Sequence, residues 1–190
     1  MDGYYTEKEL KDFGFKYIGK NVLISRKACI YGAHEMEIGD NVRIDDFVML
    51  VGKIIIGNYV HIAPFCSLHG SAGGSVRMKD FSGLSAYCAV YAASDDYSGE
   101  FLSNPTVPKE YVKIDVSDIV LEKHSLVGLR CVLLPGAYLA EGTVLGACSL
   151  LNKLTEPWTM YVGIPAKKLK NRSQHALALE RKLLEQDGEI

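Results

Sequence analysis

Large aliphatic residues recur at every sixth position along most of the chain. The longest unbroken series is Leu121, Val127, Leu133, Leu139, Leu145 and Leu151. A small residue stands four positions after most of them, at Ser125, Cys131, Ala137, Thr143 and Ser149. The same register recurs upstream in groups of three that begin at Ile18, Ile38, Ile56 and Met78. No helical period matches this spacing. Repeats of six in groups of three predict a triangular coil of about eighteen residues, with one short strand on each face.

Each predicted coil can bury its aliphatic side chains only against the next coil, so about six coils would share one core. The large residues fill the axis, and the small residues lie where the chain turns a corner. This packing places Cys66, Cys88 and Cys131 inward as core residues rather than as reactive thiols. We therefore predict one all-β solenoid, with coils over residues 18–93 and 119–156.

Two interruptions and two helical ends complete the prediction. Residues 34–37 form a short surface turn. The long segment 94–118 leaves the repeat, and an excursion of this length within a compact repeat domain is typical of a functional or a disordered segment; we favour a functional one. Thr6 and Glu9 form a capping-box pattern, which predicts a helical cap within residues 1–17. Residues 163–190 are expected to form a bend and then an amphipathic helix.

Composition narrows the class of protein. The chain has 190 residues, of which 48% are hydrophobic, and this suits a single folded domain. The net charge of -2 argues against a broad nucleic-acid-binding surface. No apolar run approaches the ~18 to 20 residues that span a bilayer, so we expect a soluble, cytoplasmic protein. The five cysteines have no CxxC-like spacing, which indicates neither a disulfide framework nor a zinc site.

The hexad, the long loop and two C-terminal segments together resemble the hexapeptide-repeat acyltransferases, notably galactoside and maltose acetyltransferases and the sugar acetyltransferases of bacterial polysaccharide pathways. The two segments are residues 145–149, Leu-Gly-Ala-Cys-Ser, and residues 163–167, Gly-Ile-Pro-Ala-Lys. The resemblance covers nearly the whole chain. It implies a left-handed parallel β-helix, although parallel crossovers are otherwise right-handed. It also implies acetyl-CoA as co-substrate and a homotrimer with active sites between neighbouring subunits.

The resemblance also implies where the donor binds. In the family the pantetheine arm runs past exposed backbone amides of the last coils, a wall that corresponds here to Gly128, Gly146 and Ala147. Small residues let a ligand approach the backbone closely. The cations expected to meet the phosphates are Lys153, Lys167, Lys168 and Arg172. The alternative for these cations is a solvated basic surface near the last helix.

The acceptor side departs from the family pattern. A hydroxyl or amine that attacks a thioester must lose a proton, and relatives place a histidine in the long loop for this step. This loop has no histidine, and Asp95 falls at the corresponding position. The candidates for the base are His69 first, then Asp95 or Asp96, and then His61; both histidines follow inward positions and should point outward, and the alternative for each residue is a polar residue at an interface or on the surface. His69 shares an apolar and aromatic column with Tyr91, which is typical of a subunit interface.

We therefore expect an enzyme that transfers acetyl from acetyl-CoA to a sugar or nucleotide sugar in surface polysaccharide biosynthesis, such as that of lipopolysaccharide or capsule. Both O- and N-acetylation remain open, because the carboxylates of Asp95, Asp96 and Glu100 could receive a cationic aminosugar. A non-catalytic scaffold or assembly module is the alternative, but it does not explain the long polar loop. A metal-dependent hydratase on this solenoid would need closely spaced histidines, which this chain lacks, so no metal is expected.

Overall fold

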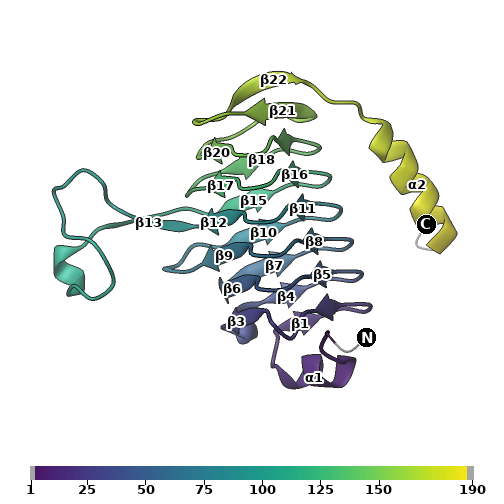
Figure 1. The fold of residues 1–190 in the computed structure, drawn as a ribbon, viewed down its shortest axis with the longest axis horizontal. Helices are drawn as coiled ribbons and strands as arrows, with labels where there is room; N and C mark the ends of the chain where they lie inside the picture. Colours follow the sequence, from purple (N-terminus) through teal and green to yellow (C-terminus); the bar gives the residue numbers. More distant parts are fainter. Residues whose placement is uncertain (1–2, 188–190) are drawn as a thin grey trace.

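The computed structural model describes residues 3–187, which form a three-sided prism of stacked coils (Figure 1). The first face consists of β1 (Tyr17–Ile18), β4 (Glu37–Ile38), β7 (Ile54–Ile56), β10 (Val76–Met78), β15 (Ile119–Leu121) and β18 (Tyr138–Leu139). The second face consists of β2 (Leu23–Ile24), β5 (Arg43–Ile44), β8 (His61–Ile62), β11 (Gly83–Leu84), β16 (Leu126–Val127), β19 (Val144–Leu145), β21 (Thr159–Val162) and β22 (Lys167–Asn171). The third face consists of β3 (Cys29–Tyr31), β6 (Met49–Gly52), β9 (Ser67–Gly70), β12 (Ala89–Tyr91), β17 (Val132–Leu133) and β20 (Leu150–Leu151).

Successive coils stack in register, so that equivalent hexad residues lie directly above one another. On the second face, for example, Ile44 pairs with Ile24 and with Ile62 in parallel strands. All three side chains are fully buried along the axis of the prism. The expected solenoid of about six coils and its inward hexad positions are confirmed, and the fold is the left-handed parallel β-helix that the resemblance implied.

The corner between the second and third faces combines inward thiols with outward aromatic rings. Cys66, as predicted, is buried inside this corner. On the outside, Phe65 stacks between Phe47 and Tyr87, with ring centroids 4.9 and 4.8 Å apart. These three aromatic residues, the corner ladder, are each about half exposed. The three backbones have φ of 60 to 63°, a region that non-glycine residues seldom adopt outside turns.

The N-terminal cap forms as expected within the described residues. Helix α1 (Glu7–Asp12) begins with a capping box, in which Thr6 Oγ1 accepts the Glu9 backbone N–H and the Glu9 carboxylate accepts the Thr6 N–H. Leu10 is buried and joins the core of the first coil. Residues 1–2 of the predicted cap lie outside the described residues.

The C-terminal segment differs from the expectation that the bend leads directly into a helix. After the bend, β22 (Lys167–Asn171) returns antiparallel to β21 (Thr159–Val162) before α2 (His175–Asp187) begins. β22 covers the open edge of β21 at the end of the second face, and its exposed lysines discourage edge-to-edge pairing with other chains. Residues 188–190 of the predicted helix lie outside the described residues. Neither helix of residues 3–187 has the length and apolar composition that crossing a bilayer requires.

The long segment leaves the prism, as predicted, but it is not structureless. Its two ends, β13 (Ala93–Asp95) and β14 (Ile114–Val116), pair in antiparallel fashion, and a 3-10 helix, η2 (Lys109–Tyr111), lies between them. Figure 1 shows the loop projecting away from the coils beside the third face. The short interruption is also a turn, formed by the 3-10 helix η1 (Ala33–Glu35).

Candidate active site

A cavity of about 500 Å³ lies where the excursion loop leaves the third face. We call it the loop pocket. It is lined by His69, Ser71, Ala72, Tyr91, Ala93, Ser94, Asp95, Asn104, Pro105, Val107, Lys109, Val112 and Ile114. The pocket therefore unites two of the residues singled out in the sequence, His69 from the prism and Asp95 from the loop. Most of its other lining residues are apolar, which is common in ligand sites that have few polar groups.

His69 is held in a fixed orientation on the outer side of β9. Its Nε2 lies 2.8 Å from Ser67 Oγ, and its ring stacks on Tyr91 with centroids 4.2 Å apart. Partial burial lowers the pKa of His69 below its usual value. The ring is therefore neutral at neutral pH, which is the form that can accept a proton.

Asp95 ends β13 and presents a carboxylate to the same pocket. Its Oδ2 accepts only the backbone N–H of Asn104, at 3.3 Å. The other carboxylate oxygen has no hydrogen-bond partner among residues 3–187. Asp95 thus keeps acceptor capacity for a ligand, whereas a fully paired carboxylate would not.

Asp96 has a different environment, although it is the next residue. Its carboxylate accepts hydrogen bonds from the Ser98 N–H and hydroxyl, and Lys113 Nζ lies 3.7 Å away. These bonds from Ser98, together with Lys113, hold the pKa of Asp96 below its usual value. Asp96 does not line the loop pocket, and its contacts stabilise the turn within the loop.

His61 belongs to a second cavity, of about 390 Å³, on the second face. We call it the second-face recess; its lining residues are Tyr59, His61, Ala63, Phe81, Ser82, Gly83, Leu84, Ser85, Ala86 and Leu126. Asp45 Oδ2 lies 2.8 Å from His61 Nε2, and Asp45 Oδ1 accepts the Arg43 Nε–H at 2.7 Å. Within one chain, therefore, His61 is not brought together with His69 and Asp95.

Sequence reasoning did not identify Asp45 as the partner of His61. Burial raises the pKa of Asp45, but the hydrogen bonds from His61 and Arg43 outweigh burial and hold it below its usual value. The six-residue register could have identified this cluster, because it places Arg43 directly beside His61 in the adjacent coil. Outward residues about one coil apart are neighbours in any such stack.

The predicted donor wall lies at the corner between the second and third faces, in the last coils. A Cβ atom at Gly128 would lie 2.7 Å from the Ala147 nitrogen, and one at Gly146 would lie 2.6 Å from Val162 Cγ1. Close stacking of the backbone therefore requires glycine at position 128, whereas a side chain at position 146 would displace the side chain of Val162. The backbone N–H groups of Leu129 and Ala147 have no hydrogen-bond partner among the described residues, and both residues are exposed.

Buried thiols explain why these amides point outward. Cys88 Sγ donates to the Gly128 carbonyl and Cys131 Sγ donates to the Gly146 carbonyl, both at 3.1 Å. Because a trans peptide is planar, an inward carbonyl directs the N–H of the next residue outward. The inward cysteines thus help to form a row of free donors along the wall.

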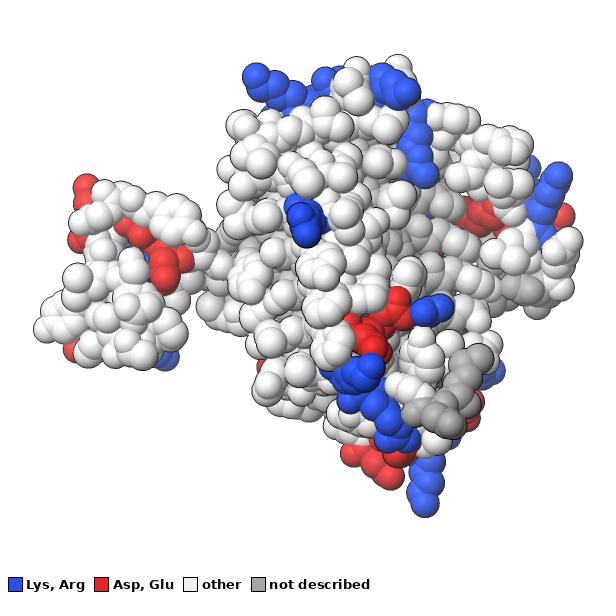
Figure 2. All heavy atoms as spheres, in the orientation of Figure 1, with Lys and Arg blue, Asp and Glu red and all other residues white. Residues whose placement is uncertain are grey.

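The predicted cations separate into two groups. Figure 2 shows lysine and arginine side chains gathered over the end of the prism where β22 lies. Lys168 Nζ pairs with Glu156 at 2.6 Å, whereas Lys153 and Lys167 have no carboxylate within 4 Å among residues 3–187. Arg172 Nη1 instead donates to the carbonyls of residues 124 and 142, at 2.9 Å each, which ties the C-terminal segment to the prism.

Comparisons with known proteins agree with this architecture. The family model described as bacterial transferase hexapeptide (six repeats) matches residues 35–70. The dTDP-4-amino-4,6-dideoxy-D-glucose acyltransferase of Escherichia coli is 41% identical over 180 residues, which cover 93% of each chain. A maltose O-acetyltransferase from Clostridium difficile 630 shares the fold, with a TM-score of 0.55 at 15% identity, covering 88% of this chain and 75% of its own.

The crystal structure of AntD, an N-acyltransferase from Bacillus cereus, in complex with dTDP and 3-hydroxybutyryl-CoA superimposes with a TM-score of 0.96 at 40% identity, covering 99% of this chain and 100% of its own. An AntD variant at one serine, in complex with dTDP-4-amino-4,6-dideoxyglucose and coenzyme A, matches with a TM-score of 0.94 at 40% identity, covering 97% of this chain and 98% of its own. The expectation of an acyltransferase that uses a coenzyme A thioester, rather than a scaffold, is confirmed by these relatives. The protein belongs to the hexapeptide-repeat family of acyl-CoA-dependent sugar acyltransferases.

Proposed function

We propose that the protein transfers an acyl group from an acyl-CoA to the amino group of a dTDP-linked aminodeoxy sugar. The observation that carries this choice is the loop pocket, where the loop supplies the partly unpaired carboxylate of Asp95. A carboxylate binds and orients an amine or ammonium group through charge-assisted hydrogen bonds. The relatives that are about 40% identical carry names and ligands of the same kind, namely dTDP, a dTDP-aminosugar and coenzyme A thioesters.

In the proposed reaction, the amine nitrogen attacks the thioester carbonyl carbon, the C–S bond breaks, and the amine proton leaves with the coenzyme A thiol. Asp95 orients the amine, and the neutral ring of His69 takes the proton during the attack. His69 rather than Asp95 takes this proton, because its ring is neutral and the carboxylate of Asp95 is occupied in orienting the amine.

On the donor side, we propose that the pantetheine arm follows the row of free amides at Leu129 and Ala147. Glycines at positions 128 and 146 keep this wall flat. The phosphates would then meet Lys153 and Lys167, together with Lys168. These assignments extend the family arrangement to the matching positions of this chain.

We also propose a homotrimer acting in the cytoplasm, with each loop pocket closed by a neighbouring subunit. Support comes from the large apolar surface that the loop exposes in a single chain, including Tyr97 at 85% and Leu102 at 59%. Exposed apolar patches of this kind mark interaction sites. Projection of the loop away from its own prism leaves that surface free to contact another copy (Figure 1).

The activity is tested by thiol release from acetyl-CoA with two acceptors that differ at one atom. We expect release with dTDP-4-amino-4,6-dideoxyglucose and essentially none with the 4-hydroxy analogue, because a site built for an amine rejects the hydroxyl. Release with the hydroxy analogue at an equal rate would contradict N-acylation, and release with neither would contradict the proposed acceptor class.

Replacing Asp95 with Asn should raise KM for the aminosugar about tenfold to a hundredfold, because one charge-assisted hydrogen bond is lost. The matched control is Asp115→Asn, on the strand that pairs with β13, where the carboxylate has no contact with the loop pocket. Steady-state kinetics of both variants measure this change in KM. An equal rise in KM for the two variants would exclude Asp95 from the acceptor site.

The pH dependence of kcat tests His69. Burial lowers its pKa, so the neutral, proton-accepting form should persist and kcat should fall only below the usual histidine pKa of about 6.5. His69→Gln should reduce kcat at least about a hundredfold and abolish this acidic limb. A variant with unchanged kcat and the same limb would show that His69 is not the base.

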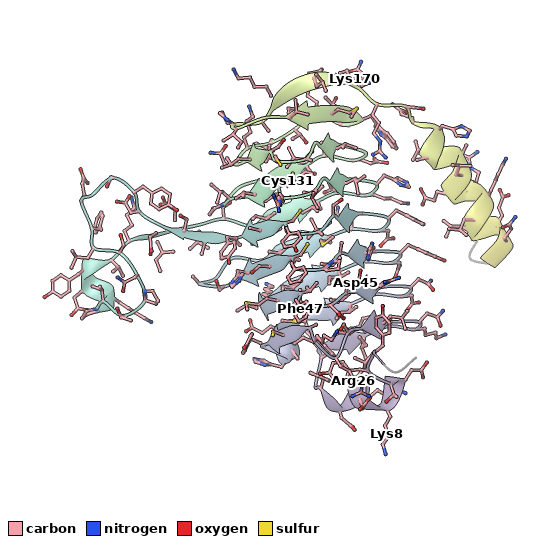
Figure 3. The ribbon with its side chains drawn as sticks, in the orientation of Figure 1. Lys8, Arg26, Asp45, Phe47, Cys131 and Lys170 are labelled. Carbon is pink, nitrogen blue, oxygen red and sulfur yellow. The ribbon has the colours of Figure 1, made fainter. Side chains whose placement is uncertain are left out.

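Lys167→Ala should raise KM for acetyl-CoA about threefold to tenfold and leave KM for the acceptor nearly unchanged, because only a phosphate contact is lost. Lys8→Ala is the control, since Lys8 lies at the opposite end of the molecule from the β22 lysines (Figure 3). Equal effects of Lys167→Ala on both Michaelis constants would argue against the phosphate contact.

A further inference from the structure

The excursion loop supplies a set of aliphatic side chains to the loop pocket, and we call this set the aliphatic wall. Its members are Ala93, Pro105, Val107, Val112 and Ile114. Among residues 3–187, none of the residues that line this pocket belongs to the hydrophobic core of the prism. The aliphatic wall therefore does not stabilise the stacked coils, and its surface is open to a ligand.

The aliphatic wall is separate from the surface that the loop offers to a neighbouring subunit. The most exposed apolar residues of the loop, Tyr97 and Leu102, do not line the pocket. Ile114, by contrast, lines the pocket and is still 46% exposed in the single chain. A cavity of this size with an apolar lining is typical of a site that binds a small molecule.

The free carboxylate of Asp95 lies at the edge of this wall. Asp95 pairs directly with Ile114 across the two antiparallel strands of the loop, and Ala93 stands two residues before Asp95 in the same strand. Directly paired residues, and alternate residues of one strand, project to the same face of a sheet. Asp95, Ile114 and Ala93 therefore share one face, with the polar group beside the two aliphatic ones.

The proposed reaction brings the acyl group to this face. Asp95 holds the amine, and the amine nitrogen must come within about 3 to 3.5 Å of the thioester carbonyl carbon before it attacks. That carbon carries three groups. The sulfur leads to the pantetheine arm, and the oxygen needs hydrogen-bond donors as negative charge develops on it. Only the alkyl group of the acyl chain gains from contact with aliphatic side chains, so the wall beside Asp95 suits that group.

The sugar of the acceptor matches the aliphatic wall poorly. Its hydroxyl groups need hydrogen-bond partners when they are buried. Two polar side chains that line the pocket already bond within the loop. The Ser94 hydroxyl donates to the Asp95 carbonyl, and the Asn104 side-chain oxygen accepts the N–H and the hydroxyl of Thr106.

An acetyl group is too small to cover the aliphatic wall. Beyond its carbonyl it has a single methyl group, whereas the wall is formed by side chains around a cavity of about 500 Å³. A longer chain would bury more of this surface, and each further buried methylene strengthens binding roughly fourfold. Ala93 has the smallest side chain of the wall, so it leaves space for a ligand beside Ile114.

We propose that the aliphatic wall binds the alkyl chain of the donor, and that the preferred donor carries a short acyl chain longer than acetyl, such as butyryl. This inference rests on the proposed function and adds the class of acyl group to it. The bonds that form and break are the same for every donor: the amine nitrogen bonds the carbonyl carbon, the C–S bond breaks, and the proton leaves with the thiol. Chain length therefore changes only the binding of the acyl group.

A donor series tests the preference. Thiol release is measured with acetyl-, propionyl- and butyryl-CoA and a saturating concentration of dTDP-4-amino-4,6-dideoxyglucose. We expect kcat/KM to rise with each methylene and to be about tenfold higher for butyryl-CoA than for acetyl-CoA. A value for acetyl-CoA that equals or exceeds the value for butyryl-CoA would overturn the proposal.

Ala93→Leu tests the wall, because the larger side chain fills space beside Ile114. We expect the ratio of kcat/KM for butyryl-CoA to kcat/KM for acetyl-CoA to fall at least about tenfold. Val116→Leu is the matched control, since Val116 pairs with Ala93 on the opposite strand but does not line the pocket. Its ratio should equal that of the wild type. An unchanged ratio in Ala93→Leu, or an equal fall in the control, would contradict acyl binding at this wall.

Ile114→Thr removes apolar surface without adding bulk, and it keeps a β-branched side chain that suits a strand. The same ratio should fall about threefold to tenfold, because the alkyl chain loses part of its contact. A ratio equal to that of the wild type would count against the wall. The donor series also separates this inference from the proposed function. Thiol release with no donor would refute the proposed function, whereas equal release with all three donors would refute the acyl preference alone.

Discussion

In-register stacking of the coils is the constraint on which the rest of the structure depends. Backbone hydrogen bonds join each strand to the equivalent strands above and below, so a residue is always flanked by its counterparts in the adjacent coils. Inward positions must therefore be aliphatic or small in every coil. Outward positions carry no such requirement, so polar side chains such as those of Arg43 and His61 can stand there without disturbing the core.

The same constraint links the core to the donor wall. The chain must turn the corner within a few residues. The inward thiols of Cys88 and Cys131 stabilise this turn by donating hydrogen bonds to the Gly128 and Gly146 carbonyls. The free amides outside the corner are a direct consequence. A buried cysteine therefore not only packs in the core but also sets the direction of the backbone amides that a ligand would meet.

The six-residue repeat predicted the features that recur in every coil, and it predicted little of the rest of the structure. It placed the inward residues, directed His61 and His69 outward, and put His69 beside Tyr91, because each of these follows from the register. The return strand β22 was not predicted, since an antiparallel pair breaks the period. Within the loop, the sequence left both Asp95 and Asp96 as candidates; only the contacts with Ser98 and Lys113 show that Asp96 is already paired. The handedness came from family resemblance, because periodicity is the same for both hands.

A convex prism does not by itself enclose a substrate, and this limits how such a fold can become an enzyme. Its own surface offers shallow cavities, such as the second-face recess, and an excursion that projects into solvent. Enclosure then requires a second surface, which another copy of the chain would supply in the proposed homotrimer. The exposed corner ladder and the apolar loop suit such a solution, because exposed apolar patches of this kind mark interaction surfaces. In the proposed homotrimer, assembly and catalysis would then depend on the same surfaces.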